Sequence, residues 1–173
     1  MANQKRQIQF LEKEEIDLLI QSIEFKRKRS RKERRLWYLA LRDRALIETL
    51  FSTGLRISEA LALPDAPFMR VPADKTLELS VIGKGGWQRV IFFSPRALRA
   101  INEWMLARTD NALRLFPITV RAAQYMIKRR ARQAGIEKRV TPHMMRHSIA
   151  THLLRQGVSV YYVQQFLGHR AIS

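Results

Sequence analysis

The stretch from Thr76 to Phe93 departs from helical spacing and therefore limits the fold more than any other part of the sequence. Residues 76–82 alternate weakly between apolar and polar side chains, and residues 89–93 are β-branched and aromatic. Between them, Gly83-Lys84-Gly85-Gly86 permits the positive φ angles of a tight turn. We expect an antiparallel hairpin here, with a third strand near Phe68 to Val71.

Elsewhere, apolar residues recur at helical spacing. Gly54 is a stop signal for one helix, and Thr141 with Pro142 forms a cap and first turn for another. The sequence therefore predicts one mainly α domain with a small antiparallel β-sheet at one side, an α+β fold. The expected helices cover about 10–23, 33–52, Arg56 to before Pro64, 96–107, 119–134, 142–155 and 159–167.

The charge of the chain points to its partner. Lys and Arg number 32 against 15 Asp and Glu, a net charge of +17. Such a chain repels itself unless it meets a polyanion, and nucleic acid is the commonest one, which makes double-stranded DNA one candidate partner. An acidic protein or an anionic membrane surface is the alternative that charge alone leaves open. The densest run, Lys26 to Arg35, fits a solvated surface or a phosphate-tracking arm.

Composition also excludes several classes of protein. Cysteine is absent, so disulfides and thiolate metal sites are excluded. The sequence has neither a signal peptide nor an apolar run near the roughly 20 residues of a membrane span. It also lacks a tight Asp/Glu cluster for divalent metals. We expect a soluble cytoplasmic protein that needs no membrane, metal or cofactor.

Two clusters bring cationic side chains into distinctive settings. Arg56 opens a short helix, and Glu59 lies close enough to orient its guanidinium, although such a pair is ordinarily a surface ion pair. Lys84 stands at the tip of the hairpin. It is either simply exposed or delivered by the turn into a DNA groove.

Two further clusters contain histidine. His143 and Arg146 lie three residues apart, so both can face one ligand from the same side of a helix. We interpret His147 as a structural histidine. His169 follows Gly168 just beyond the end of the last predicted helix.

Together the clusters resemble the signature of the tyrosine recombinase (phage integrase) family. The matching segments are "TGLRISEAL", "VIGKG" with Arg89 following, "AGIEKRVTPHMMRHSIATHLL" and "VQQFLGHRAIS". The resemblance implies a catalytic domain over residues 10–173, preceded by an N-terminal extension over 1–9 and without a separate core-binding domain.

The resemblance also implies a mechanism. Members of this family cut DNA through a 3′-phosphotyrosine and rejoin it to a second strand, without metal or cofactor. Arg56 and Arg146 would stabilise the charge of the transition state, and Lys84 would protonate the leaving oxygen. The implied catalytic residues are Arg56, Lys84, His143, Arg146 and His169, with Glu59 steadying Arg56; the expected DNA contacts are Arg89, Lys128, Arg129, Arg130 and Arg132.

The nucleophile is the point at which the sequence departs from the family. The resemblance implies a tyrosine about nine positions after His169, whereas the sequence ends at Ser173. Tyr161 and Tyr162 precede His169 and are not expected to substitute for it. We therefore expect residues 1–173 alone to be inactive.

Three functional classes follow from the sequence. The first is a site-specific recombinase or integrase, which we expect to self-associate as a tetramer on DNA when its C-terminal tail is present. The second is a DNA-binding regulator without catalysis. The third, a type IB topoisomerase, is less favoured by the wording around Lys84 and His169.

Overall fold

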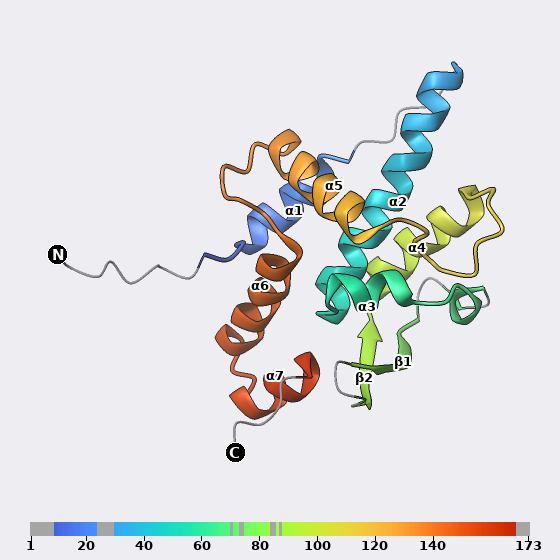
Figure 1. The fold of residues 1–173 in the computed structure, drawn as a ribbon. Helices are drawn as coiled ribbons and strands as arrows, with labels where there is room; N and C mark the ends of the chain where they lie inside the picture. The colour runs from blue at the N-terminus through green and yellow to red at the C-terminus, as the bar shows by residue number, and fades with distance from the viewer. Residues whose placement is uncertain are drawn as a thin grey trace.

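The structure is a computed structural model that describes residues 9–23, 30–69, 71–72, 75–83, 86 and 88–168. Figure 1 shows helices packed around α2, with a two-stranded sheet at one edge of the molecule. The elements in chain order are α1 (Lys13–Gln21), α2 (Arg31–Thr53), α3 (Ile57–Ala62), the 3-10 helix η1 (Ala66–Phe68), β1 (Leu77–Ile82), β2 (Gln88–Phe93), α4 (Pro95–Ala107), α5 (Val120–Gln133), α6 (Pro142–Arg155) and α7 (Val160–Leu167).

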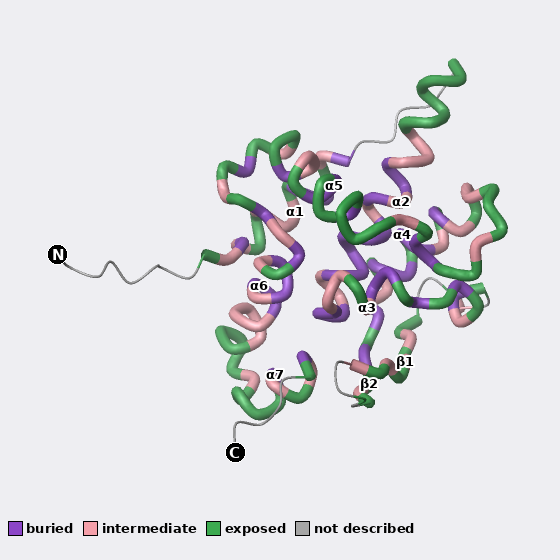
Figure 2. Tube along the Cα trace, viewed as in Figure 1, coloured by how far each residue is buried: buried purple, intermediate pink, exposed green. Residues whose placement is uncertain are grey.

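The long helix α2 forms the centre of the core. Its N-terminus is closed by a capping box, in which Ser30 Oγ accepts from the Glu33 N–H and the Glu33 carboxylate accepts from the Ser30 N–H. Residues 31–36 are exposed and extend from the body of the molecule, whereas Leu46, Ile47 and Leu50 are buried (Figure 2). The cap explains why the helix starts earlier than apolar spacing alone predicts.

The predicted hairpin is confirmed, and the predicted third strand is wrong. β1 and β2 pair antiparallel with a register from Leu77 opposite Phe93 to Ile82 opposite Gln88. Phe68 instead ends the 3-10 helix η1. Pro67 fixes φ and lacks a donor for a sheet ladder, and the Phe68 ring packs edge-on against Phe93 at 5.0 Å between centroids.

The predicted helices are confirmed with boundaries close to those expected. The signals at α6 act as predicted, because Thr141 Oγ1 accepts from the Met144 N–H and Pro142 occupies the first turn. The fold is therefore mainly helical with a small antiparallel sheet. Within the described part of the chain, no helix is long and apolar enough to cross a membrane.

Gly54 lets the end of α2 pack tightly against α7. It caps α2 in the left-handed conformation with φ 61°. A Cβ atom placed there would lie 2.8 Å from Leu167 Cδ2 and 3.0 Å from Phe166 Cε1. Both the backbone conformation and the contact with α7 therefore favour glycine at this position.

Gly54→Ala should lower the free energy of unfolding by about 2–4 kcal/mol, because it adds left-handed strain and overpacking together. Gly135→Ala is the matched control, since Gly135 also has positive φ but nothing lies within 4 Å of an added Cβ. That variant should lose about 1–2 kcal/mol. Urea unfolding measures both values, and equal losses would contradict the tight contact between Gly54 and α7.

Candidate functional site

The turn between α2 and α3 places Arg56 and Glu59 together. Arg56 is the N-cap of α3 with extended backbone, and its N–H donates to Glu59 Oε2 at 2.9 Å. The Arg56 guanidinium also donates through Nη1 to Glu59 Oε1 at 3.0 Å. The Arg56 side chain is 38% exposed, whereas that of Glu59 is 10% exposed. The carboxylate therefore fixes an arginine that still reaches the surface.

Arg89 approaches the same carboxylate from the sheet. Its Nη2 donates to Glu59 Oε2 at 2.6 Å and its Nη1 to Glu59 Oε1 at 3.3 Å. Burial acts to raise the pKa of Glu59, but hydrogen bonds and charge from Arg89 and Arg56 outweigh it and hold the pKa below its ordinary value. Glu59 therefore stays ionised between the two arginines.

Arg146 joins this cluster from α6. Its side chain is buried, with Nη1 donating to the Gly54 carbonyl at 2.5 Å and Nη2 donating to the Leu167 carbonyl. Arg146 thus holds the C-terminal ends of α2 and α7, where helix carbonyls attract cations. Burial, followed by the nearby charge of Arg56, lowers the pKa of Arg146 to about 10.

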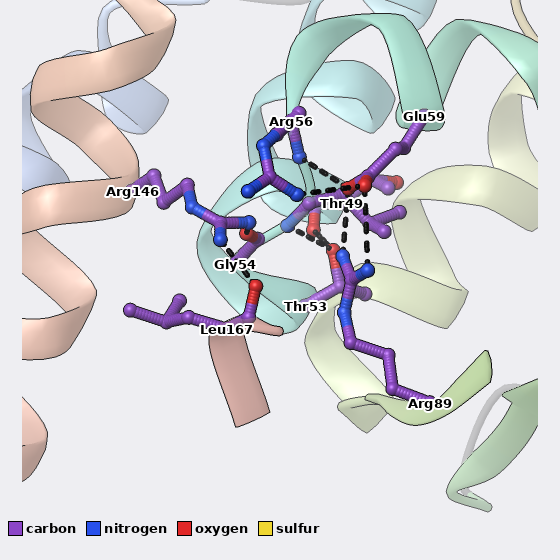
Figure 3. Close-up of polar contacts among 9 residues, drawn as sticks. Thr49, Thr53, Gly54, Arg56, Glu59, Arg89, Arg146 and Leu167 are labelled. Atoms are coloured by element: carbon purple, nitrogen blue, oxygen red, sulfur yellow. Dashed lines mark hydrogen bonds and ion pairs between the residues drawn. The ribbon is translucent and has the colours of Figure 1, made fainter. Parts of the chain in front are cut away.

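These contacts define an arginine cluster made of Arg56, Arg89 and Arg146 around Glu59 (Figure 3). Three guanidinium charges and one carboxylate charge leave a net charge of +2. A partly buried excess of positive charge is unfavourable unless an anion offsets it. The paired donors of guanidinium groups match the oxygens of a phosphate. The arrangement is therefore suited to a phosphodiester.

Of the other three predicted catalytic residues, the structure describes only His143. His143 is exposed in the first turn of α6, one helical turn before Arg146. Lys84 and His169 lie outside the described residues. The structure therefore brings Arg56, Glu59 and Arg146 together and leaves the positions of Lys84 and His169 as predictions.

The residues predicted to contact DNA fall into two groups. Lys128 and Arg132 are exposed on α5. Arg130 instead donates through Nε and Nη2 to the fully buried Asp43, at 3.0 and 2.8 Å, and Arg129 donates to the same carboxylate at 3.2 Å. The Arg130 guanidinium is thus occupied inside the protein, whereas the contacts of Lys128 and Arg132 with DNA remain predictions.

Arg89 is also directed inward. Its side chain is 9% exposed, and it shares the inner face of the sheet with Ile91 and Phe93. The alternation of residues 89, 91 and 93 was the sequence signal for this orientation, because successive side chains of a strand face opposite sides. The prediction that Arg89 contacts DNA does not take this alternation into account.

A second carboxylate among the described residues, the fully buried Asp43, also bonds three arginines, Arg42, Arg129 and Arg130, but this group contains none of the predicted catalytic residues. Among the described residues there is no group of three or more His, Asp or Glu side chains that could hold a metal ion. A hollow of about 330 Å³ lies between β2 and α7, with Arg89 and Tyr162 among its lining residues. The arginine cluster therefore remains the candidate site.

Several known recombinases are similar to this chain in sequence or in fold. Tyrosine recombinase XerC of Xylella fastidiosa (strain 9a5c) is 42% identical over 101 residues, which cover 54% of this chain and 33% of that protein. The XerA recombinase structure superposes with a TM-score of 0.71 at 25% identity, covering 94% of this chain and 56% of that one. The structure of the XerH site-specific recombinase bound to palindromic difH substrate, a post-cleavage complex, superposes with a TM-score of 0.75 at 26% sequence identity. This match covers 95% of this chain and 47% of the XerH chain.

The fold is that of a tyrosine recombinase catalytic domain. The sequence profile of the phage integrase family matches residues 9–173, and the chain belongs to this family. The match spans about a third of the length of the XerC relative.

Glu59→Gln should lower the free energy of unfolding by about 1.5–3 kcal/mol at pH 7, because it removes charged hydrogen bonds to two arginines. The folded-state pKa of Glu59 lies below the ordinary value of 4.5, so its charge stabilises the fold above that pH. This contribution is lost as the pH falls through the folded-state pKa. The difference between the variant and the parent should therefore shrink in urea unfolding at about pH 3.

Glu103→Gln is the control for this measurement. Glu103 forms a more exposed ion pair, 3.4 Å from Arg44, and such pairs contribute little. Its replacement should change stability by less than about 1 kcal/mol at either pH. An equal loss for Glu59→Gln at pH 7 and pH 3 would show that the Glu59 charge does not hold the cluster.

Proposed function

We propose that this chain is the catalytic domain of a site-specific DNA recombinase that cleaves and rejoins strands through a 3′-phosphotyrosine. Membership of the phage integrase family supports this proposal. The relatives include a XerH recombinase whose structure is a post-cleavage complex with its difH substrate. The arginine cluster of this chain carries the argument further, because its chemistry suits the reacting phosphate.

The cluster supplies what phosphoryl transfer demands. Negative charge accumulates on the non-bridging oxygens in the transition state, and preorganised donors stabilise it without reorganising. Arg146 is fixed by two backbone carbonyls, and Arg56 is fixed by Glu59. Each guanidinium keeps further N–H donors for a ligand, because five are available per side chain. Two fixed cations can thus act electrostatically as metal ions do in other nucleases.

The remaining steps use residues outside this cluster. Lys84 protonates the departing 5′-oxygen, which is a poor leaving group as an alkoxide. His143, in the first turn of α6, hydrogen-bonds the phosphate or accepts the tyrosine proton, and His169 donates to a non-bridging oxygen. Glu59 acts through Arg56.

We assign the nucleophile to a tyrosine about nine residues after His169. The tyrosines within the sequence are Tyr38, Tyr125, Tyr161 and Tyr162. Tyr38 donates to Asp110 and packs on Trp104, and the other three are exposed. The tyrosine pair on α7 precedes the Leu-Gly-His motif, which supports a nucleophile further along the chain.

Strand exchange requires two duplexes and therefore several copies of the protein. We propose that the protein self-associates as a tetramer on DNA when its C-terminal tail is present. We also propose that it works in the cytoplasm, which is where a cell without a nucleus keeps its DNA.

Arg146→Ala should abolish the covalent protein–DNA complex, and Arg56→Ala should slow its formation by roughly 10²–10³, the usual cost of one oxyanion donor. A protein extended downstream through the tyrosine is incubated with a nicked suicide substrate. Adducts stable to boiling detergent are then counted. Arg96→Gln is the control, because Arg96 is also ion-paired but contacts Glu48 and Asp17 on other elements. That variant should react like the parent.

Three results would contradict this assignment. An extended protein that binds duplex DNA but forms no adduct would favour a DNA-binding regulator. Arginine variants as active as the parent would remove the cluster from the mechanism. An adduct formed by residues 1–173 alone, and lost in Tyr161→Phe or Tyr162→Phe, would place the nucleophile on α7.

Duplex binding should weaken steeply with salt, because phosphate contacts release counterions with a slope of about −0.9 per contact. Lys128→Gln together with Arg132→Gln should reduce that slope by about two, since both side chains are exposed on α5. Arg130→Gln is the matched control from the same helix, and it should leave the slope nearly unchanged. Binding is measured between about 50 and 200 mM salt, and a slope unaffected by the double variant would remove α5 from the DNA-binding surface.

A further inference from the structure

Glu59 bonds both Arg56 and Arg89, and the contacts indicate that Arg89 balances most of its charge. Its two oxygens accept four hydrogen bonds, two from Arg56 and two from Arg89. One of the Arg56 bonds comes from its backbone N–H, so the two Arg89 contacts outnumber the single guanidinium contact of Arg56. Arg89 also has the less exposed side chain, at 9% against 38%. Arg89 is therefore the principal counter-ion of Glu59.

Arg89 also lies close to the C-terminal end of α7. Gly168 has φ 65°, and a Cβ atom there would lie 2.9 Å from Arg89 Cδ and 3.1 Å from its Nη1. Arg89 therefore lies where the N-terminus of α3, the second strand of the hairpin and the last turn of α7 meet. Each of these elements adjoins one of the predicted catalytic residues, respectively Arg56, Lys84 and His169.

We propose that Arg89 is a positioning residue that neutralises Glu59, so that the charge of Arg56 stays available to the phosphate. This inference rests on the proposed function of the arginine cluster. Arg89 bonds the Glu59 carboxylate and neutralises its charge. The carboxylate in turn orients Arg56 without neutralising the positive charge of Arg56. Arg89 touches neither substrate nor reacting atoms in this role.

The charge of the site follows from this division. With Arg89 present, the Glu59–Arg89 pair is neutral and the two remaining arginines offer +2 to an anion. Without the Arg89 charge, Glu59 is neutralised by Arg56 instead, and the net charge available to an anion falls to +1. Because the pair is largely buried, this loss is weakly screened by solvent. Removing the Glu59 charge as well returns the site to +2.

A purely structural tie makes a different prediction. If Arg89 served only to join β2 to α3, then removing both partners would leave anion binding as weak as removing Arg89 alone, or weaker. Rescue by a second substitution therefore separates the electrostatic role from the structural one.

The test is a titration of the folded chain with inorganic phosphate, followed by the NMR signals of arginine Nε–H groups. Arg89→Gln should raise the dissociation constant about tenfold. Glu59→Gln/Arg89→Gln should restore it to within about threefold of the parent, and Arg89→Lys should also bind phosphate well. Arg96→Gln is the control for loss of an ion pair outside the cluster, and it should leave the dissociation constant unchanged.

The outcomes are distinguishable. If Arg89→Gln binds like the parent, or the double variant binds as weakly as Arg89→Gln, the inference about Arg89 is overturned. If Arg56→Met and Arg146→Met also bind like the parent, the phosphate site itself fails and the proposed function with it. Should Arg89→Gln fail to fold, Arg89→Lys and the double variant decide together: the inference requires both to bind phosphate within about threefold of the parent, and weaker binding by either overturns it.

Discussion

Three guanidinium groups lie near the carboxylate of Glu59, and hydrogen bonds to the surrounding elements stabilise this concentration of positive charge. Two of the arginines donate directly to the carboxylate, and the third donates to the carbonyl ends of α2 and α7. The positive charge left over has no protein partner of opposite sign within these contacts. A bound phosphate would supply the missing negative charge. The contacts that hold the arginine cluster together therefore also position it to bind an anion.

The frame around the cluster depends on close approaches of the backbone. Gly54 ends α2 in the left-handed conformation, which turns the chain toward Arg56 and leaves room for α7. Gly168 leaves corresponding room for the Arg89 side chain. Arg146 then joins α2 to α7 across segments that are far apart in the sequence. A displacement of α7 would therefore be felt at both Arg89 and Arg146.

Local signals predicted most of the fold, whereas the family resemblance pointed to Arg56, Glu59 and Arg146 as site residues. The Thr141-Pro142 cap set the start of α6, and the glycine-rich turn set the hairpin. The prediction of a strand near Phe68 was wrong. Phe68 lies in a short 3-10 helix that contains Pro67, and its ring packs against Phe93. Aromatic residues favour strands only where the backbone can also pair.

Long-range pairings account for what the sequence did not reveal. Arg89 faces Glu59 from a strand 30 residues away, and Arg130 faces the buried Asp43 from a helix 87 residues away. Both arginines look like surface cations in a basic sequence, because the partner carboxylate is set only by tertiary packing. The strand alternation with Ile91 and Phe93 nevertheless indicated the inward direction of Arg89.

The central claim is that the arginine cluster receives a DNA phosphate, and the most direct measurement is the position of the duplex on the folded protein. A crystal structure with bound duplex should place non-bridging oxygens of one phosphate within hydrogen-bonding distance of both Arg56 and Arg146, with Arg89 still bonded to Glu59. A duplex bound across another face, with the backbone of the DNA remote from Arg56 and Arg146, would contradict the account.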